Sequence, residues 1–138
     1  ELLYTEARGK LDRALEVIKK YLVLKRIKGA KVLATFELEK ALFVGDFPPY
    51  GKVTGWVSDW LNSEHKNGVY VLGIASDMMV IRVSATETFD LNKIVAQLLK
   101  EKPYAGISGG GHEKAGTIKF VPAARDEVVA FVENYIGG

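Results

Sequence analysis

Apolar residues recur with two different periods along the chain, and the alternation between these periods predicts an α/β fold. Four segments repeat apolar residues every three or four positions, as expected for helices with one buried face. They are residues 6–26, 53–67, 91–102 and 124–136. Between them lie runs of β-branched and apolar residues that predict strands. These runs are residues 31–38, 69–76, 78–85 and 116–121. The order predicts an α/β domain with a single mixed β-sheet of about four to five strands and packed helices, led by a long N-terminal helix.

Residues at the ends of these segments support the predicted boundaries. Gly29 ends the first helix, Asp90 is placed to cap the third, and Pro103 stops it. The spacing of the second helix places Trp56 and Trp60 on its apolar stripe, which favours core packing over base stacking. The inward positions predicted for the third helix are Leu91, Ile94, Val95, Leu98 and Leu99.

Composition narrows the class of protein. A chain of 138 residues with 48% hydrophobic and 26% charged residues is typical of one globular domain. The absence of cysteine excludes disulfides and thiolate metal sites. No apolar run approaches the roughly 18 residues of a transmembrane helix, so we expect a cytoplasmic protein with no membrane contact.

Charge is distributed unevenly along the chain. Residues 1–31 contain nine Lys or Arg and four Asp or Glu, a local charge of +5. The net charge of the whole chain is +2, which leaves −3 for the remainder. A basic first helix could lie along a nucleic-acid backbone, or it could simply be a solvated helix face. The charges alone leave both interpretations open.

The sequence offers little for catalysis within this chain. Its two histidines, His65 and His112, are far apart, and its acidic residues are spread along helix faces rather than clustered. There is no G-x-S-x-G nucleophile motif, and no Gly-Lys-Ser/Thr follows the glycines around Ser108 as a Walker loop requires. We therefore predict no catalytic residue and no metal ligand set in this chain.

One segment, "YAGISGGGHEKAGTIKF", combines three consecutive glycines with a histidine. Gly109, Gly110 and Gly111 precede His112, and Gly116 follows soon after. Glycine permits positive φ and close approach of an anion, so successive amides of such a loop can bind phosphate oxygens. His112 would add a donor, and Lys114 a flexible cation. The alternative is a glycine turn that only leads into the last strand.

The segment "GGGHEKAG" resembles the Gly-Gly-Gly-His motif of the DHH-associated domain, the C-terminal half of DHH-family phosphoesterases. This family includes RecJ-like single-strand exonucleases, oligonucleotide hydrolases and cyclic dinucleotide phosphodiesterases. The upstream segment 78–101 is also similar, with an Arg-Val-Ser element followed by an Asp-Leu helix start. The resemblance covers residues 69–136 well, and the first half only through the order of its elements.

The resemblance implies a site that binds substrate and leaves catalysis to another domain. It carries over to the glycines and His112 of the motif and to Ser84; Arg82 belongs to the same strand element. The family's catalytic DHH domain holds two Mn²⁺ or Mg²⁺ ions that activate water, and no Asp-His-His triplet occurs here. Many members have arginine where this chain has Thr86. Many also have Ala-Ala-Gly or Ala-Ser-Gly after the histidine, whereas this chain has only Ala115-Gly116. The chain departs from the family pattern at both places.

The resemblance therefore implies two parts, a linker-like helix at 1–28 and a DHH-associated substrate-binding domain at 29–138. The chain begins at Glu1 without methionine, and we expect a fragment of a longer phosphodiesterase or exonuclease that is inactive alone. Its expected partners are single-stranded nucleic acid or an oligonucleotide, the DHH domain of the same polypeptide, and a possible replication protein. Alternatives are an RNA-binding module similar to the C-terminal domain of alanyl-tRNA synthetase, and a non-catalytic replication scaffold domain.

Overall fold

The predicted alternation of helices and strands forms one mixed β-sheet with helices on both faces. The computed structural model describes residues 12–13, 15–41, 50–84 and 89–137. Residues 15–21 are helical. The strands are β1 (Val23–Ile27), β2 (Lys31–Glu37), β3 (Val69–Ile74), β4 (Met78–Val83), β5 (Ser108–His112) and β6 (Ala115–Lys119). The longer helices are α2 (Tyr50–Glu64), α3 (Leu91–Glu101) and α4 (Arg125–Gly137). The short 3₁₀ turns are η1 (Lys28–Ala30), η2 (Leu38–Ala41), η3 (Pro103–Ala105) and η4 (Pro122–Ala124).

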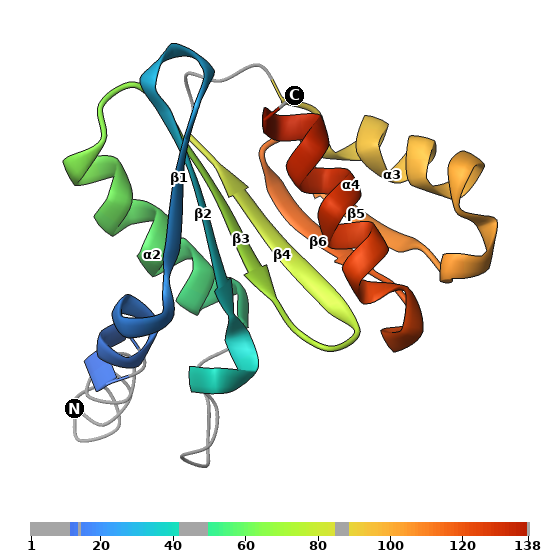
Figure 1. The fold of residues 1–138 in the computed structure, drawn as a ribbon, viewed down its shortest axis with the longest axis horizontal. Helices are drawn as coiled ribbons and strands as arrows, with labels where there is room; N and C mark the ends of the chain where they lie inside the picture. The colour runs from blue at the N-terminus through green and yellow to red at the C-terminus, as the bar shows by residue number, and fades with distance from the viewer. Residues whose placement is uncertain (1–11, 14, 42–49, 85–88, 138) are drawn as a thin grey trace.

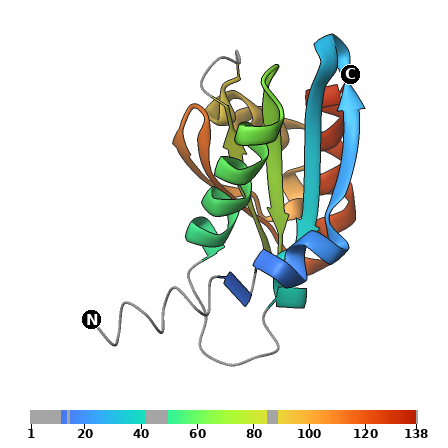
Figure 2. The same cartoon turned by 90° about the vertical axis from the view of Figure 1, so that its left-hand side faces the viewer.

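The sheet has the strand order β1-β2-β3-β4-β6-β5 (Figure 1). Strands β2 and β3 are parallel, and the other neighbours are antiparallel. A parallel pair needs a crossover connection, and α2 provides it. Helix α2 covers one face of the sheet, and α3 and α4 cover the other (Figures 1 and 2). The predicted α/β class and single mixed sheet are confirmed, with six strands in the described residues instead of four to five.

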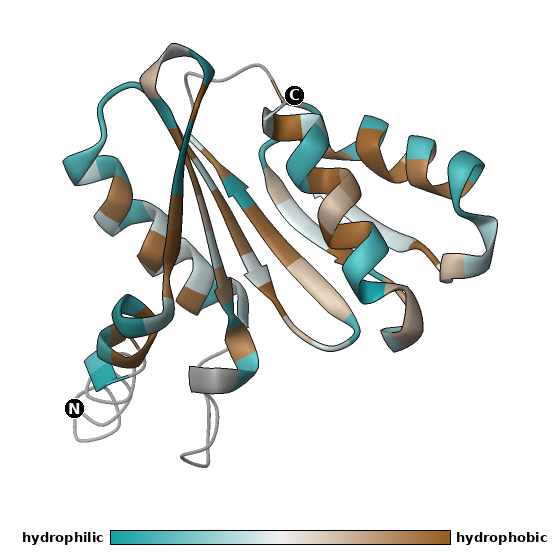
Figure 3. Ribbon diagram, viewed as in Figure 1, coloured by the Kyte–Doolittle hydropathy of each residue, from teal (hydrophilic) through white to brown (hydrophobic). Residues whose placement is uncertain are grey.

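Each face of the sheet is covered by its own apolar layer, and the helices turn their apolar stripes toward the strands (Figure 3). Under α2 the layer includes Val57, Leu61 and Val71, all fully buried. Under α3 and α4 it includes Leu72 and Ile118, also fully buried. Alternate residues of β3 therefore enter different layers, which explains why the whole strand is apolar.

The N-terminal helix ends earlier than the sequence predicts. The sequence predicts a helix to about residue 26, within a linker-like segment to residue 28. The last part of this predicted segment, from Val23 to Ile27, instead forms β1. This strand pairs with β2 through a tight turn in which Gly29 has φ 73° and Ala30 has φ 58°. The helical spacing of apolar residues in 23–27 is overridden by pairing with the edge of β2. The part of the predicted helix at residues 6–11 lies outside the described residues.

Most details of the other predicted helices are confirmed. The Asp90 carboxylate accepts a hydrogen bond from the Asn92 backbone N–H at 3.0 Å and caps α3, which ends before Pro103. Four of the five predicted inward residues of α3 are buried, but Leu99 is 50% exposed because it lies beside the stripe. Trp56 and Trp60 are only half-buried. The Trp60 indole donates to Glu64 at 3.1 Å, so this residue lies at the edge of the core.

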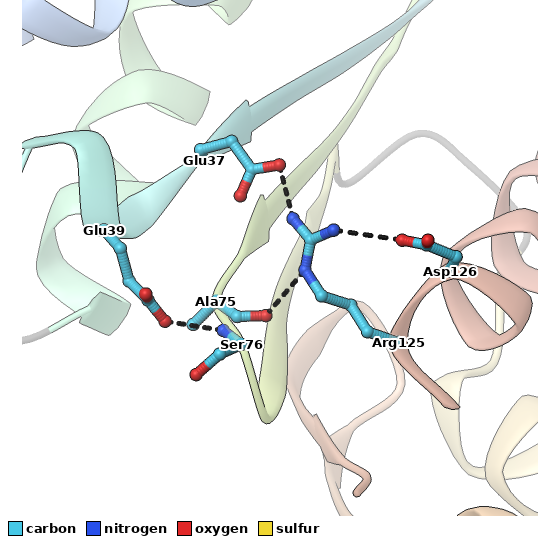
Figure 4. A network of polar contacts seen from close by, with 6 residues as sticks. All are labelled: Glu37, Glu39, Ala75, Ser76, Arg125 and Asp126. Atoms are coloured by element: carbon cyan, nitrogen blue, oxygen red, sulfur yellow. Dashed lines mark hydrogen bonds and ion pairs between the residues drawn. The ribbon is translucent and has the colours of Figure 1, made fainter. Parts of the chain in front are cut away.

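The sheet has two ends of different chemistry. We call the end where β4 and β5 finish and β2, β3 and β6 begin the His112 end, and the opposite end the Arg125 end. At the Arg125 end, the Arg125 guanidinium donates to Glu37, to Asp126 at 3.1 Å and to the Ala75 carbonyl at 3.2 Å (Figure 4). Glu39 accepts from the Ser76 backbone N–H at 2.6 Å. These contacts join α4, β2 and the β3–β4 turn.

Candidate functional site

The Gly-Gly-Gly-His segment is a strand, not the predicted loop. Gly109, Gly110, Gly111 and His112 belong to β5, the outermost strand of the sheet, which pairs antiparallel with β6. The turn between the two strands is Glu113-Lys114. Glycine composition suggested a loop, but here the glycines allow two backbones and a helix to approach closely.

Glycine is required in β5 by its backbone angles and by its neighbours. Gly109, Gly110 and Gly111 have φ of 118°, 132° and 151°, and residues with a Cβ rarely adopt these values. A Cβ on Gly109 would lie 2.1 Å from the Thr117 carbonyl oxygen. A Cβ on Gly116 would lie 2.4 Å from the Gly110 carbonyl oxygen. The glycines thus fix the shape of the hairpin that presents His112 and Lys114.

Helix α3 supports this hairpin from the face opposite α2. Its second residue, Asn92, donates its side-chain amide to the Gly111 carbonyl at 3.2 Å. The Leu91 backbone N–H donates to the Glu113 carbonyl at 2.9 Å. The Asp90 cap therefore does more than start a helix, because it positions the residues that hold the β5–β6 turn. No local pattern in the sequence indicates this role of Asn92.

Three of the predicted site residues line a common pocket. Arg82 and Ser84 come from the end of β4, and Lys114 comes from the β5–β6 turn. The pocket has a volume of about 340 Å³ and lies between these strands and α2. Helix α2 contributes side chains that the sequence pattern did not single out. The lining residues of α2 are Gly55, Ser58, Asp59 and Asn62.

Arg82 enters the pocket along the surface of α2. Its guanidinium lies beside Gly51 and Gly55, where a Cβ would be at ordinary contact distance from it, 3.8–3.9 Å. Its Nη2 donates to the Gly51 carbonyl in a long contact of 3.4 Å. Its Nε is buried without a hydrogen-bond partner among the described residues. A buried guanidinium N–H that lacks an acceptor is energetically costly.

Ser84 has a structural role at the start of β3. Its hydroxyl accepts from the Val69 backbone N–H at 3.2 Å, and its own backbone N–H donates to the Val69 carbonyl at 3.0 Å. The Ser84 residue also lines the pocket. In the α2 wall, Asn62 donates to Ser58 at 3.4 Å. Hydroxyl and amide groups and the Asp59 carboxylate thus accompany the two cations.

The strand register brings His112 to the same end and face. Arg82 is opposite Ala115, and Ala115 is opposite His112. Residues paired across strands point to the same side of a sheet, so the exposed His112 lies on the α2 side, two strands from Arg82. Gly109, Gly110, Gly111 and Gly116 shape the hairpin without lining the pocket. The position of Thr86, where this chain departs from the family pattern, lies outside the described residues.

The described residues contain no group of three His, Cys, Asp or Glu side chains that could hold a metal ion. In the same residues, no helix has the length and apolar character needed to cross a lipid bilayer.

Comparison with known proteins places the fold among DHH-domain proteins. No protein-family model matches the chain. A curated relative, the uncharacterized protein MJ1198 of Methanocaldococcus jannaschii, is 33% identical over 140 residues, covering 96% of this chain and 18% of the relative. A solved structure described as a member of the s1p family of ribosomal proteins, PF0399 DHH domain, matches with a TM-score of 0.88 and 29% identity. The match covers 97% of this chain and 32% of that one.

RecJ is a more distant structural neighbour. RecJ of Thermus thermophilus, solved with Mg²⁺, has a TM-score of 0.56 and 16% identity over 96% of this chain and 18% of its own. The chain thus spans less than a third of each of these proteins. At the level of the fold, these neighbours confirm the resemblance to a DHH-associated domain of a RecJ-like protein.

Proposed function

We propose that this chain is the substrate-binding part of a DHH-family phosphodiesterase or nuclease, and that it binds the phosphates of a single-stranded nucleic acid or short oligonucleotide. The phosphate would enter the pocket of Arg82, Ser84 and Lys114, with His112 at its rim. Hydrolysis belongs to a separate DHH domain of the same polypeptide, which would hold the Mn²⁺ or Mg²⁺ ions. No chemical step is assigned to this chain.

The convergence of Arg82, Ser84 and Lys114 is the observation that carries the proposal. These residues come from two separate segments of the sequence and meet in one open pocket beside His112. Guanidinium, ammonium and hydroxyl groups are the usual ligands of phosphate oxygens in proteins. Among the described residues, the Arg82 guanidinium makes a single long hydrogen bond, to the Gly51 carbonyl, and lines the pocket with its N–H donors.

The hairpin offers backbone donors in a form different from the predicted nest. Strand β5 is the outermost strand, and an edge strand directs alternate N–H and C=O groups away from the sheet. Because its residues are glycine, no side chain other than that of His112 would keep a phosphate from the later part of this edge. The proposal thus retains the predicted glycine–histidine site but replaces a loop with an edge strand.

Binding of a 5′-phosphorylated dinucleotide to the 138-residue chain tests the proposal. Lys114→Ala and His112→Ala should each weaken binding about three- to tenfold, since each removes one charged or polar contact in a partly solvated site. Lys100→Ala, on the exposed side of α3, is the matched control and should leave the affinity unchanged. Fluorescence anisotropy with a labelled dinucleotide gives the dissociation constants.

Equal affinities for Lys114→Ala, His112→Ala and Lys100→Ala would rule out the pocket as a phosphate site. A dinucleotide without the terminal phosphate should also bind more weakly than the phosphorylated form. Loss of that difference in the Lys114→Ala variant would locate the phosphate at the pocket.

The division of labour between domains has a separate test. The 138-residue chain with Mn²⁺ should not hydrolyse a labelled oligonucleotide. Turnover that copurifies with the chain through several columns, and that Arg82→Ala abolishes, would place catalysis here and contradict the proposal.

A further inference from the structure

We propose that the nucleic-acid strand continues past the C-terminal end of α2 to a second binding site between β1 and that end of the helix. This inference rests on the proposed function and extends it by requiring a substrate several nucleotides long. The second site is a hollow of about 280 Å³ lined by Leu24, Lys25, Arg26, Val32 and His65.

The hollow lies at the His112 end and on the same face as the phosphate pocket. Arg26 pairs with Val32, and Val32 pairs with Val69. The Ser84 backbone N–H donates to the Val69 carbonyl, and the Val69 N–H donates to the Ser84 hydroxyl. Residues in one cross-strand row point to the same side of a sheet, so Arg26 and Ser84 share the α2 face. Both views show the β1–β2 turn, the end of α2 and the β5–β6 turn at one end of the molecule (Figures 1 and 2).

The distance between the two sites suits a polymer. Three strand spacings separate β1 from β4 in the strand order, about 14 Å at about 4.8 Å each. From β1 to β5 there are five spacings, about 24 Å. That is about seven nucleotides at the roughly 3.4 Å rise of a stacked strand, and fewer if the strand is extended.

The chemistry of the hollow matches a nucleic-acid backbone. Lys25 and Arg26 are exposed, and neither has an ion-pair partner among the described residues. His65 is half-buried at the end of α2, where its backbone N–H donates to the Leu61 carbonyl at 2.8 Å. Leu24, 48% exposed, adds an apolar wall against which a sugar or base can lie. A positively charged groove that follows the backbone is one element of sequence-independent single-strand binding.

The nearby acidic residue Glu64 does not cancel the positive charge of the hollow. Glu64 is exposed, and its carboxylate accepts from the Trp60 indole N–H. Lys28 and Lys31 flank the β1–β2 turn and add to the positive charge of this end. An acidic peptide would find the same cations but would gain nothing from continuity with the phosphate pocket, so the strand of nucleic acid is the occupant we favour.

The dependence of affinity on oligonucleotide length tests this inference. Labelled single strands of two, four, six and eight nucleotides, as DNA and as RNA, are titrated with the 138-residue chain. For the wild type, affinity should rise with length and level off once the strand reaches both sites. Arg26→Ala should weaken binding of the eight-nucleotide strand about three- to tenfold and leave the dinucleotide unaffected, whereas Arg26→Lys should recover most of the affinity.

The controls separate this inference from the proposed function. Lys100→Ala, with its melting temperature, reports unspecific loss of charge or folding. If Arg26→Ala binds the eight-nucleotide strand as the wild type does, the second site is refuted while dinucleotide binding still supports the phosphate pocket. If the dinucleotide does not bind but the long strand does and responds to Arg26→Ala, the phosphate pocket fails and the second site stands. Equal affinity at all lengths overturns the extended path.

Discussion

The two ends of the sheet both carry charged side chains but use them differently. At the Arg125 end, the guanidinium of Arg125 is shared among Glu37, Asp126 and a backbone carbonyl (Figure 4). At the His112 end, Arg26 lies exposed and Arg82 points into an open pocket with a buried N–H that lacks an acceptor among the described residues. One end uses its arginine to connect elements, and the other leaves donors for a ligand.

The pKa of Arg125 reflects this difference. Hydrogen bonds to Glu37 raise its pKa above the usual value, against the opposing effect of burial. A partly buried arginine with a full set of acceptors stabilises the fold. Whether an arginine of this sheet serves stability or binding thus follows from its hydrogen-bond partners more than from its exposure.

The largest expected effect disrupts the β5–β6 hairpin that carries His112. Gly109→Ala forces a side chain into a backbone conformation that costs about 1–3 kcal/mol and places its Cβ against the Thr117 carbonyl oxygen. We expect a loss of about 3 kcal/mol in the free energy of unfolding, measured by urea denaturation, with loss of dinucleotide binding.

Gly55→Ala is the matched control for that substitution. A Cβ there meets only the Arg82 guanidinium at ordinary contact distance, 3.9 Å. Because alanine is favoured over glycine inside a helix, it should stabilise the protein by up to about 1 kcal/mol. Equal stability of Gly109→Ala and wild type would show that β5 does not pack on β6 as described.

A second, smaller effect should appear at the Arg125 end without any change in binding. Arg125→Met keeps part of the apolar stem but removes the donors to Glu37 and the Ala75 carbonyl. We expect a loss of about 1–3 kcal/mol in unfolding free energy, since hydrogen bonds to charged groups contribute about that much. Oligonucleotide affinity should remain that of the wild type. A loss of affinity as large as that of Lys114→Ala would mean that the two ends are not independent.

The order of elements and the cap of α3 could be predicted from the sequence, because both depend on local signals such as apolar period and the Asp90 carboxylate. Strand β1 was missed, since strand pairing at 23–27 depends on the edge of β2 and not on local spacing. Local composition also predicts a loop at Gly109, Gly110 and Gly111, which instead belong to β5. Three successive residues with positive φ in a strand are favourable only when β6 and Asn92 lie against them, which is a tertiary condition.

The candidate site shows the same division between local and tertiary information. Arg82, Ser84 and Lys114 could be selected from residue type and resemblance, and the structure brings them together in one pocket. Ser58 and Asn62 could not be selected in that way, because they occupy ordinary positions of an amphipathic helix. The small residues Gly51, Gly55 and Ser58 lie along one side of α2. They are the feature of the sequence that indicates where a side chain from β4 lies.

The smallest effect concerns pH at the Arg125 end. Tyr104, between α3 and α4, donates its hydroxyl to Glu127 at 2.5 Å, and this hydrogen bond raises the pKa of the phenol. A pKa that is higher in the folded than in the unfolded state contributes stability below the unfolded value of about 10, and that contribution is lost as pH rises through the folded value. Tyr104→Phe should therefore melt slightly lower than wild type at pH 7, and the difference should shrink above about pH 10. Melting temperatures measured from about pH 7 to 11 follow this trend directly, with Tyr21→Phe as a control for other tyrosine titration. Because Tyr104 is exposed and at the opposite end of the sheet from the two proposed sites, oligonucleotide affinity at pH 7 should not change. A difference in melting temperature that stays constant across this range would show that the hydrogen bond to Glu127 does not stabilise the protonated phenol.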